Sequence, residues 1–366
     1  DVDWLVVDHY SIDKKWENLV KKSVKNILVI DDLFDRDHDC DALTDPSMSL
    51  VTKNIYKKRL GKHADLLLGK KFALIDPIYL KYREKCRERD FVNPRILIFF
   101  GGIDNKDYTY KTVEYISKSD LKFKSIYVIV GRNYDNIKNL RILCKKYGHK
   151  LVVQTKKMYE FIGKCDIAIG SGGTHTWERC CLGLPTFVHS IAKNQENLIR
   201  LASKESLLFS PNKETDYIKF LDTHLKSFIK NKSLLKFISK KSFSSIDGKG
   251  CSRISNYMIQ KSLVARFANF KDSKKIFNWR NSKVVRNFSR DKNIIKIDEH
   301  NKWMKEVLTS KNESLIIVQK KQDPVGVVRF TIRSNKNAEV SIYLVPKYIG
   351  KGLGKGVLDR AEELFK

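Results

Sequence analysis

Short apolar runs alternate with longer amphipathic stretches over the first 260 residues of the chain. The runs are rich in Val, Ile, Leu and Phe, as buried parallel strands are, and the stretches between them carry apolar residues at helical spacing. The clearest runs are Trp4–Val7, Ile27–Ile30, Arg95–Phe100, Ser125–Gly131, Leu151–Gln154, Asp166–Ile169 and Thr186–His189. Because strands that alternate with helices pack as a parallel sheet, the pattern predicts an α/β fold with doubly wound parallel sheets.

The segment Phe91–Pro94 divides this region into two halves. Proline interrupts regular structure, and a new apolar run begins directly after it. We therefore expect one sheet in residues 1–92, a second sheet in residues 93–260, and a cleft between them. Ligands of open parallel sheets bind at the carboxyl ends of the strands, so this cleft is where we look for a site.

A different pattern begins at residue 262. A strand at Val264–Asn269 and helices at Lys271–Asn281 and Asp298–Leu308 precede three apolar runs joined by short polar turns, at Ser314–Lys320, Gly326–Arg333 and Ala338–Val345. Such a meander is typical of an antiparallel sheet, so residues 262–366 are predicted to be a separate α+β domain. The chain starts inside a strand-like run and stops inside a helical one, and we expect it to be a fragment at both ends.

A glycine turn joins the run Asp166–Ile169 to a predicted helix that opens at Thr174. Glycines before a helix allow a ligand to approach the backbone, and the helix N-terminus favours a diphosphate. Glu178 lies one helical turn further on, where it can accept hydrogen bonds from ribose hydroxyls. Close packing of strand and helix is the alternative explanation of the glycines alone. The nucleotide-binding candidates are Ser171, Gly172, Gly173, Thr174 and Glu178.

Further polar residues are predicted at the same cleft. Asp8-His9-Tyr10 follows the first strand, with capping of its loop as the alternative role. A second glycine turn, Gly101-Gly102, follows the run Arg95–Phe100, and a polar loop with Asn194 and Gln195 follows the run Thr186–His189.

The net charge of +29, from 71 Lys and Arg against 42 Asp and Glu, favours polyanionic partners. Nucleic acid, an anionic membrane and small phosphorylated ligands such as UDP and coenzyme A all fit that charge. The basic residues are scattered through every segment, however, and there is no aromatic stacking platform, which disfavours nucleic acid. Lysines that are merely solvated are the alternative explanation.

The seven cysteines show no C-x-x-C pair and no zinc spacing, so we expect reduced thiols, no metal and a cytoplasmic protein. No apolar run reaches the roughly 18 residues that span a bilayer, so we expect no membrane partner. The oligomeric state is not readable from the sequence.

Several motifs in the first 260 residues occur together in one family. They are Val7-Asp-His-Tyr10, Ile30-Asp-Asp-Leu33, Phe100-Gly-Gly102, Gly170-x-Gly-Gly-Thr-x-Thr-Trp-Glu-Arg-Cys-Cys-Leu-Gly-Leu-Pro185, Ile191-Ala-x-Asn-Gln195 and Asp247-Gly-x-Gly250. On these, residues 1–260 resemble the UDP-2,4-diacetamido-2,4,6-trideoxy-β-L-altropyranose hydrolases of pseudaminic acid biosynthesis, which have the GT-B fold of glycosyltransferases.

The resemblance implies a reaction and a set of roles. Water replaces UDP at the anomeric carbon, the turn Ser171–Thr174 and Glu178 hold UDP, and Tyr10 and Asn194 line the sugar site as catalytic residues. The family's base is a histidine on an N-terminal glycine loop that these residues do not contain, and His9 is not its equivalent by motif. The base is therefore unassigned, and residues 1–260 alone are expected to bind UDP but to turn substrate over slowly or not at all.

The last third of the chain carries Asn278-Trp-Arg-Asn281, His300-x-x-Trp303 and Ile349-Gly-x-Gly-x-Gly354. By these it resembles the GNAT superfamily of N-acetyltransferases, in particular members that acetylate the 4-amino group of a UDP-amino sugar in the same pathway. The resemblance implies acetyl-CoA as co-substrate, with its pyrophosphate at Gly350, Gly352 and Gly354. Glu339 is our candidate for the base, and a solvated glutamate on an edge strand is the alternative.

We thus expect a UDP-sugar hydrolase fused to an acetyltransferase, with the acetylated product of the one as the substrate of the other. A glycosyltransferase of the same fold, in which an acceptor takes the place of water, is one alternative. A non-catalytic nucleotide-binding protein is the other. UDP release from UDP-sugars without an acceptor separates these alternatives from the hydrolase.

Overall fold

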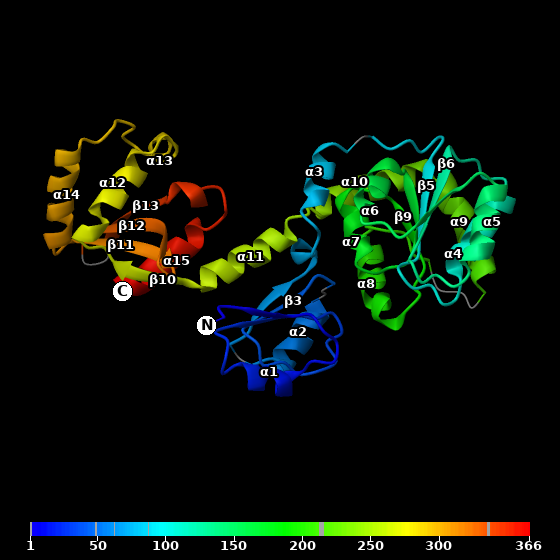
Figure 1. Cartoon of the computed structure of the whole chain (residues 1–366), viewed down its shortest axis with the longest axis horizontal. Coiled ribbons are helices and arrows are strands. Elements are labelled where there is room, and N and C mark those ends of the chain that lie inside the picture. Colours follow the sequence, from blue (N-terminus) through cyan, green and yellow to red (C-terminus); the bar gives the residue numbers. More distant parts are fainter. Residues whose placement is uncertain (1, 48–49, 62, 87, 212–215, 335–336) are drawn as a thin grey trace. The chain divides into compact units, whose positions relative to one another are not determined.

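The computed structural model describes residues 2–47, 50–61, 63–86, 88–211, 216–334 and 337–366. The chain forms two compact units, Asp1–Cys251 and Ser252–Lys366, which are treated separately below (Figure 1). Among the described helices, none combines the length and apolar character that crossing a bilayer requires.

The first sheet of the first unit has four parallel strands in sequence order. They are β1 (Leu5–Val7), β2 (Ile27–Ile30), β3 (Ala42–Asp45) and β4 (Asp65–Leu68). Helix α1 (Lys14–Val20) connects β1 to β2, and α2 (Leu50–Arg59) connects β3 to β4. The register pairs Val7 with Val29 and Ile30 with Thr44, so the strands end near one another at a single edge of the sheet.

The second sheet has five parallel strands in the order β7-β6-β5-β8-β9. They are β5 (Arg95–Phe99), β6 (Ser125–Val130), β7 (Lys150–Val153), β8 (Ile167–Gly170) and β9 (Thr186–Val188). The strand order reverses between β5 and β8, which makes this sheet doubly wound, as predicted. Both predicted glycine turns follow the two strands that flank the reversal, the position at which such sheets bind ligands.

Helices surround the second sheet and supply most of its core. They are α4 (Tyr108–Lys118), α5 (Ile137–Lys146), α6 (Met158–Lys164), α7 (His175–Cys181), α8 (Lys193–Lys204), α9 (Tyr217–Lys230) and α10 (Lys232–Ser245). One core cluster packs strand residues such as Ile96 and Val128 against α4, α5 and α9, and another packs Leu97 and Ala168 against α6, α7 and α8. Adjacent strand residues thus face opposite sides, and both sides are covered.

The segment between the two sheets packs with the second one. It contains η1 (Lys70–Phe72) and α3 (Ile78–Glu84), whose Tyr79 lies in the core that also contains Trp177 of α7. Helix α3 ends at Glu84. Beyond its end, the Arg89 guanidinium donates to the carbonyls of Gly183, at 2.7 Å, and of Cys165, so tertiary bonds replace the continued helix.

The second unit is an antiparallel sheet with the strand order β10-β11-β12-β13. The strands are β10 (Leu263–Phe267), β11 (Glu313–Lys320), β12 (Asp323–Ser334) and β13 (Asn337–Leu344). The other elements are α11 (Gly250–Lys261), which starts in the first unit, η2 (Phe270–Asp272), α12 (Ser273–Asn281), α13 (Lys283–Asn287), α14 (Ile297–Thr309), η3 (Pro346–Tyr348) and α15 (Gly354–Phe365).

Two separate cores lie on the two faces of this sheet. Ile316, Val318 and Val328 pack with Val357 and Ala361 of α15. Their neighbours Leu315, Ile317 and Val327 pack with residues of α12 and α14. Because side chains alternate along a strand, α15 and the α12–α14 pair cover opposite faces.

Candidate functional site

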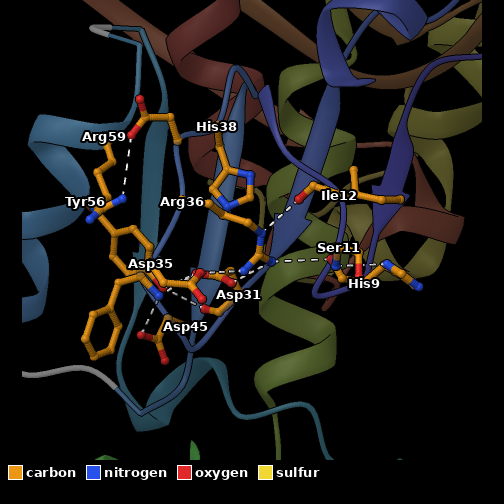
Figure 2. A network of polar contacts seen from close by, with 12 residues as sticks. His9, Ser11, Ile12, Asp31, Asp35, Arg36, His38, Asp45, Tyr56 and Arg59 are labelled. Atoms are coloured by element: carbon orange, nitrogen blue, oxygen red, sulfur yellow. Dashed lines mark hydrogen bonds and ion pairs between the residues drawn. The ribbon is translucent and has the colours of Figure 1, made fainter. Parts of the chain in front are cut away.

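The carboxylates that end β2 and β3 lie at one edge of the first sheet. The Asp31 carboxylate is buried, and neighbouring residues bind both of its oxygens (Figure 2). One of its oxygens accepts from the Phe34 N–H at 2.9 Å and the Tyr56 hydroxyl at 2.8 Å, and the other lies 2.8 Å from the Arg36 guanidinium. Asp31 therefore has a structural role, whereas its neighbour Asp32 faces a different environment.

Asp45, the last residue of β3, is fully buried and holds two hydrogen bonds from Ser47, one from the N–H and one from the hydroxyl, both at 2.7 Å. Burial raises the pKa of Asp45 to about 6, and the charges of Asp32 and Asp31 add to that effect against the opposing Ser47 hydrogen bonds. A carboxylic acid in this setting binds its proton more tightly in the folded state than in the unfolded chain.

This difference predicts how stability depends on pH. Because the folded pKa lies above the unfolded value of 3.8, the free energy of unfolding should rise as the pH falls from about 7 towards 4. Asp45→Asn, which can keep both Ser47 hydrogen bonds, should remove much of that rise and stabilise the protein at pH 8 by up to about 3 kcal/mol. Thermal denaturation between pH 5 and 8 measures this, with the exposed Asp37→Asn as control. A melting temperature of Asp45→Asn that follows the wild-type pH curve would contradict it.

Tyr10 joins the two halves of the first unit. Its hydroxyl is hydrogen-bonded to the side chains of Asp32, after β2, and Asn194, on α8. Burial raises the pKa of Tyr10, the Asp32 carboxylate raises it further, and the hydrogen bond from Asn194 opposes them. Two residues that the resemblance assigned to the sugar site, 184 positions apart in sequence, are therefore in contact here.

Asp32 is the member of this cluster that the sequence analysis did not select. Burial raises its pKa, and the charges of Asp31 and Asp8 add to the effect, while the hydrogen bond from Tyr10 lowers it. Its Oδ1 is buried and has no hydrogen-bond partner among the described residues. The motif Ile30-Asp-Asp-Leu33 pointed to this position but could not tell which of its two carboxylates contacts Tyr10.

The glycine turn after β8 is shaped first by close packing. A Cβ on Gly170 would lie 1.9 Å from the Phe99 carbonyl oxygen, and one on Gly172 would lie 2.1 Å from a carbon of Ile199. Ser171 is buried, and its hydroxyl donates to the Phe100 carbonyl at 3.0 Å, which ties this turn to the one at Gly101. The packing explanation therefore accounts for Gly170 and Gly172.

The remaining turn residues leave space for a ligand. A Cβ on Gly102 would meet no atom within 4 Å, Gly101 has φ +106°, which favours glycine, and Thr174 is exposed. Gln195 lies beside them, because its Oε1 accepts from the Gly172 and Ile191 N–H groups, each at 3.3 Å. The loop of Asn194 and Gln195 thus reaches the glycine turn.

Glu178 lies on α7 with its carboxylate already in contact with protein. It pairs with the His175 ring and is hydrogen-bonded to Tyr79, whose ring is buried. Burial raises the pKa of Glu178, but its contacts with His175, Tyr79 and Arg179 outweigh burial and hold the pKa below its usual value. Glu178 is therefore ionised at neutral pH, and a ribose hydroxyl would have to share the carboxylate with these partners.

In the second unit the glycine segment precedes α15. Gly350 and Gly352 have φ of +77° and +73°, and a Cβ on Gly350 or Gly354 would meet no atom within 4 Å. Leu353 is fully buried in the sheet core, which anchors the segment, while the backbone around it stays open. This geometry suits the approach of a pyrophosphate to the start of α15, a helix of three turns.

Glu339, on β13, is bound to two arginines. The Arg333 guanidinium donates at 2.6 Å and Arg290 at 3.3 Å, and the hydrogen bond and charge of Arg333 lower the Glu339 pKa. Ion pairing of this kind makes Glu339 a weaker base than an isolated glutamate. Among the described residues, the hydrogen bonds of the Glu339 carboxylate go to Arg290 and Arg333 and not to the glycine segment.

The comparison with known protein families matches a segment that lies within the second unit. Residues 275–366 match the model of the acetyltransferase (GNAT) family. This match supports acetyl-CoA as the co-substrate of that segment, and no group of His, Cys, Asp and Glu among the described residues could hold a metal ion.

Three relatives match shares of the chain that differ in size. An uncharacterized protein of Methanocaldococcus jannaschii, MJ1062, is 23% identical over 309 residues, 78% of this chain and 59% of its own length. The spore coat polysaccharide biosynthesis protein SpsG of Bacillus subtilis is 28% identical over 35% of this chain and 38% of its own length. The acetyltransferase PseH of Campylobacter jejuni is 27% identical over 27% of this chain and 63% of its own length. The chain thus spans less than two thirds of each relative.

Among solved structures, Acinetobacter baumannii MurG aligns with 66% of this chain and 76% of its own, at 11% identity and a TM-score of 0.46. Vibrio cholerae spermidine N-acetyltransferase, in complex with CoA and spermine, aligns with 28% of this chain and 63% of its own, at 20% identity and a TM-score of 0.26.

Proposed function

We propose that the chain combines a UDP-sugar hydrolase in residues 1–251 with an acetyl-CoA-dependent N-acetyltransferase in residues 252–366 that acts on a nucleotide-linked amino sugar. The hydrogen-bonded contact of Tyr10 with Asp32 and Asn194 carries the first part, because it gathers polar groups from both halves beside the glycine turns. The family match at residues 275–366 and the relatives that act in polysaccharide biosynthesis and acetyl transfer support the second part.

In the hydrolase, a water oxygen forms a bond to the anomeric carbon while the bond from that carbon to the UDP phosphate oxygen breaks. UDP leaves with the bonding electron pair, and the water must lose a proton. Asp32 is our candidate to take it, since its raised pKa makes it a stronger base than an ordinary aspartate and its Oδ1 has no partner among the described groups. Tyr10 donates to Asp32 and, with Asn194, would orient the sugar and the water.

In the acetyltransferase, the amine nitrogen attacks the thioester carbonyl carbon of acetyl-CoA, the carbon–sulfur bond breaks, and CoA leaves. The amine proton goes to a base, for which Glu339 stays our candidate although its arginine partners weaken it. The backbone of Gly350, Gly352 and Gly354 would hold the pyrophosphate.

A glycosyltransferase is the second candidate for residues 1–251, because the same cleft could admit an acceptor hydroxyl in place of water. Incubation of the whole chain with UDP-sugars decides between them. UDP release without an acceptor supports the hydrolase, and release that requires an added sugar acceptor supports the transferase. Stoichiometric binding of UDP without release in either assay would contradict a complete active site within residues 1–251, with Asp32 as its base.

The position of the nucleotide is tested at Glu178. Glu178→Ala should weaken UDP binding by about 1–3 kcal/mol, the range for hydrogen bonds to a charged group. Glu178→Gln, which keeps the shape and one acceptor, should have a smaller effect, and Glu160→Ala on α6 serves as the control. Calorimetry gives the affinities, and melting temperatures show whether loss of the His175 and Tyr79 contacts unfolds the variant. Unchanged UDP affinity in a folded Glu178→Ala protein would remove Glu178 from the site.

A further inference from the structure

Arg179 of α7 is a buried cation beside the glycine turn that follows β8, and neither proposed reaction has used it so far. Only 2% of its surface is exposed. Its guanidinium lies against the backbone at the end of β8, because a Cβ on Gly170 would lie 3.2 Å from Arg179 Nη1. Burial lowers the pKa of Arg179 to about 10, so the side chain keeps its charge at neutral pH. A buried charge destabilises the protein unless the groups around it compensate it.

The protein compensates this charge only in part. Arg179 Nη2 donates to the Ser171 carbonyl at 2.6 Å and to the Thr176 hydroxyl at 3.3 Å, and both acceptors are neutral. Arg179 Nε is buried and has no hydrogen-bond partner among the described residues. Glu178 acts on Arg179 through its charge, but its carboxylate is hydrogen-bonded to other side chains. An anion at the glycine turn would therefore complement the charge of Arg179.

Arg179 also fixes the direction of one peptide group in the turn. The Ser171 carbonyl and the Gly172 N–H belong to the same trans peptide plane, in which they point in opposite directions. Since the carbonyl is directed at Arg179, the Gly172 N–H is directed away from it, and it donates to Gln195 Oε1 at 3.3 Å. That bond is longer than the roughly 2.7–3.2 Å of a usual N–H···O hydrogen bond, and a charged phosphate oxygen is a stronger acceptor than an amide.

The contact between Arg179 and Ser171 supports both glycine turns. Ser171 donates its own hydroxyl to the Phe100 carbonyl at 3.0 Å, next to the turn Gly101-Gly102. Carbonyl oxygens repel phosphates, and these two carbonyl oxygens are bound to donors of the protein. The turns can therefore present N–H groups to an anion.

We propose that Arg179 is a positioning residue of the nucleotide site and makes that site selective for a diphosphate. It holds the Ser171–Gly172 peptide with the N–H toward the ligand, and its buried charge attracts the phosphates through the turn without touching them. The inference rests on the proposed nucleotide site, but the chemistry that Arg179 recognises is the diphosphate and not the uridine.

Calorimetry of the whole chain with UDP and with uridine measures the share of the affinity that the diphosphate contributes. Arg179→Met should weaken UDP binding by roughly tenfold or more, the effect expected of a unit charge about 10 Å away at an effective dielectric constant near 20, and should leave uridine binding unchanged. Arg141→Met, at an exposed position on α5, makes the same change in net charge and should leave both affinities unchanged.

A purely structural role of Arg179 gives a different result. Equal losses of UDP and uridine affinity in a folded Arg179→Met protein would overturn the inference, as would an unchanged UDP affinity or an equal loss in Arg141→Met. If the melting temperature shows that Arg179→Met does not fold, Arg179→Gln takes its place. Glutamine keeps an N–H donor for the Ser171 carbonyl and lacks the charge, so the ratio of UDP to uridine affinity should again fall, and an unchanged ratio would overturn the inference.

Failure of the proposed function is recognised separately. If the wild-type chain binds neither UDP nor uridine, the nucleotide assignment is wrong, and inorganic pyrophosphate then decides the inference. A melting temperature that pyrophosphate raises in the wild type but not in Arg179→Gln would support an anion site that depends on Arg179. No rise in the wild type would overturn the inference, and so would a wild type that binds UDP no more tightly than uridine.

Discussion

Acetyl transfer should disappear in Gly352→Glu while UDP-sugar hydrolysis persists. Gly352 has φ +73°, a left-handed conformation that costs other residues roughly 1–2 kcal/mol, and its Cβ would lie 3.1 Å from the Asn256 side chain. Glutamate adds to this a carboxylate at the place proposed for the pyrophosphate, where like charges repel. Both activities are assayed on the same preparation, by CoA release with a UDP-amino sugar and by UDP release.

Gly352→Ala is the matched control for this prediction. It introduces the same backbone penalty without the charge, so it should reduce acetyl transfer much less than glutamate does. Equal loss in the two variants would indicate backbone strain instead of repulsion. If both activities fell together in a protein with the wild-type melting temperature, the assignment of two independent reactions to the two units would be wrong.

Asp32→Asn should lower the turnover number of UDP-sugar hydrolysis by at least about 100-fold, the lower range for loss of general base catalysis. UDP affinity should change little, because the nucleotide candidates lie on the second sheet. The wild-type rate should fall as the pH drops through the raised pKa of Asp32, since the base acts in its ionised form. Loss of the carboxylate should also lower the pKa of the Tyr10 hydroxyl, which the Asp32 charge raises.

The adjacent carboxylate provides the comparison. Asp31→Asn removes the partner of Arg36 and Tyr56, so it should lower the melting temperature, whereas Asp32→Asn should not. Full turnover in Asp32→Asn would rule Asp32 out as the base. Absence of turnover in the wild-type chain would instead agree with the family resemblance, which assigns the base to a segment that these residues do not contain.

The local pattern of the sequence was sufficient for most strands and for the glycine turns. Helix α2 was not predicted, because six of the ten residues of Leu50–Arg59 are polar or charged and the others form no clear apolar stripe. The motif Asp247-Gly-x-Gly250 leads directly into α11, which begins at Gly250. A Cβ there would lie 2.0 Å from the Ala73 carbonyl oxygen, so Gly250 permits close contact between distant segments and does not mark a loop.

The function of each charged residue was harder to predict. Asp31 and Asp32 are chemically identical neighbours, yet one is held by Arg36 and Tyr56 and the other by Tyr10. Glu339 was selected by its place on a strand. In the structure, Arg333 and the more distant Arg290 lower its pKa. Each assignment depends on partners brought in from other elements.

The sequence by itself determined the alternation of strands and helices, the antiparallel sheet near the C-terminus and the glycine segments, because periodicity and glycine conformation are local properties. Only the tertiary structure decided that Tyr10, Asp32 and Asn194 meet and that Glu178 shares its carboxylate with Tyr79. Contacts, burial and pKa depend on which side chains the fold brings within a few ångströms of one another, and no local pattern encodes those distances.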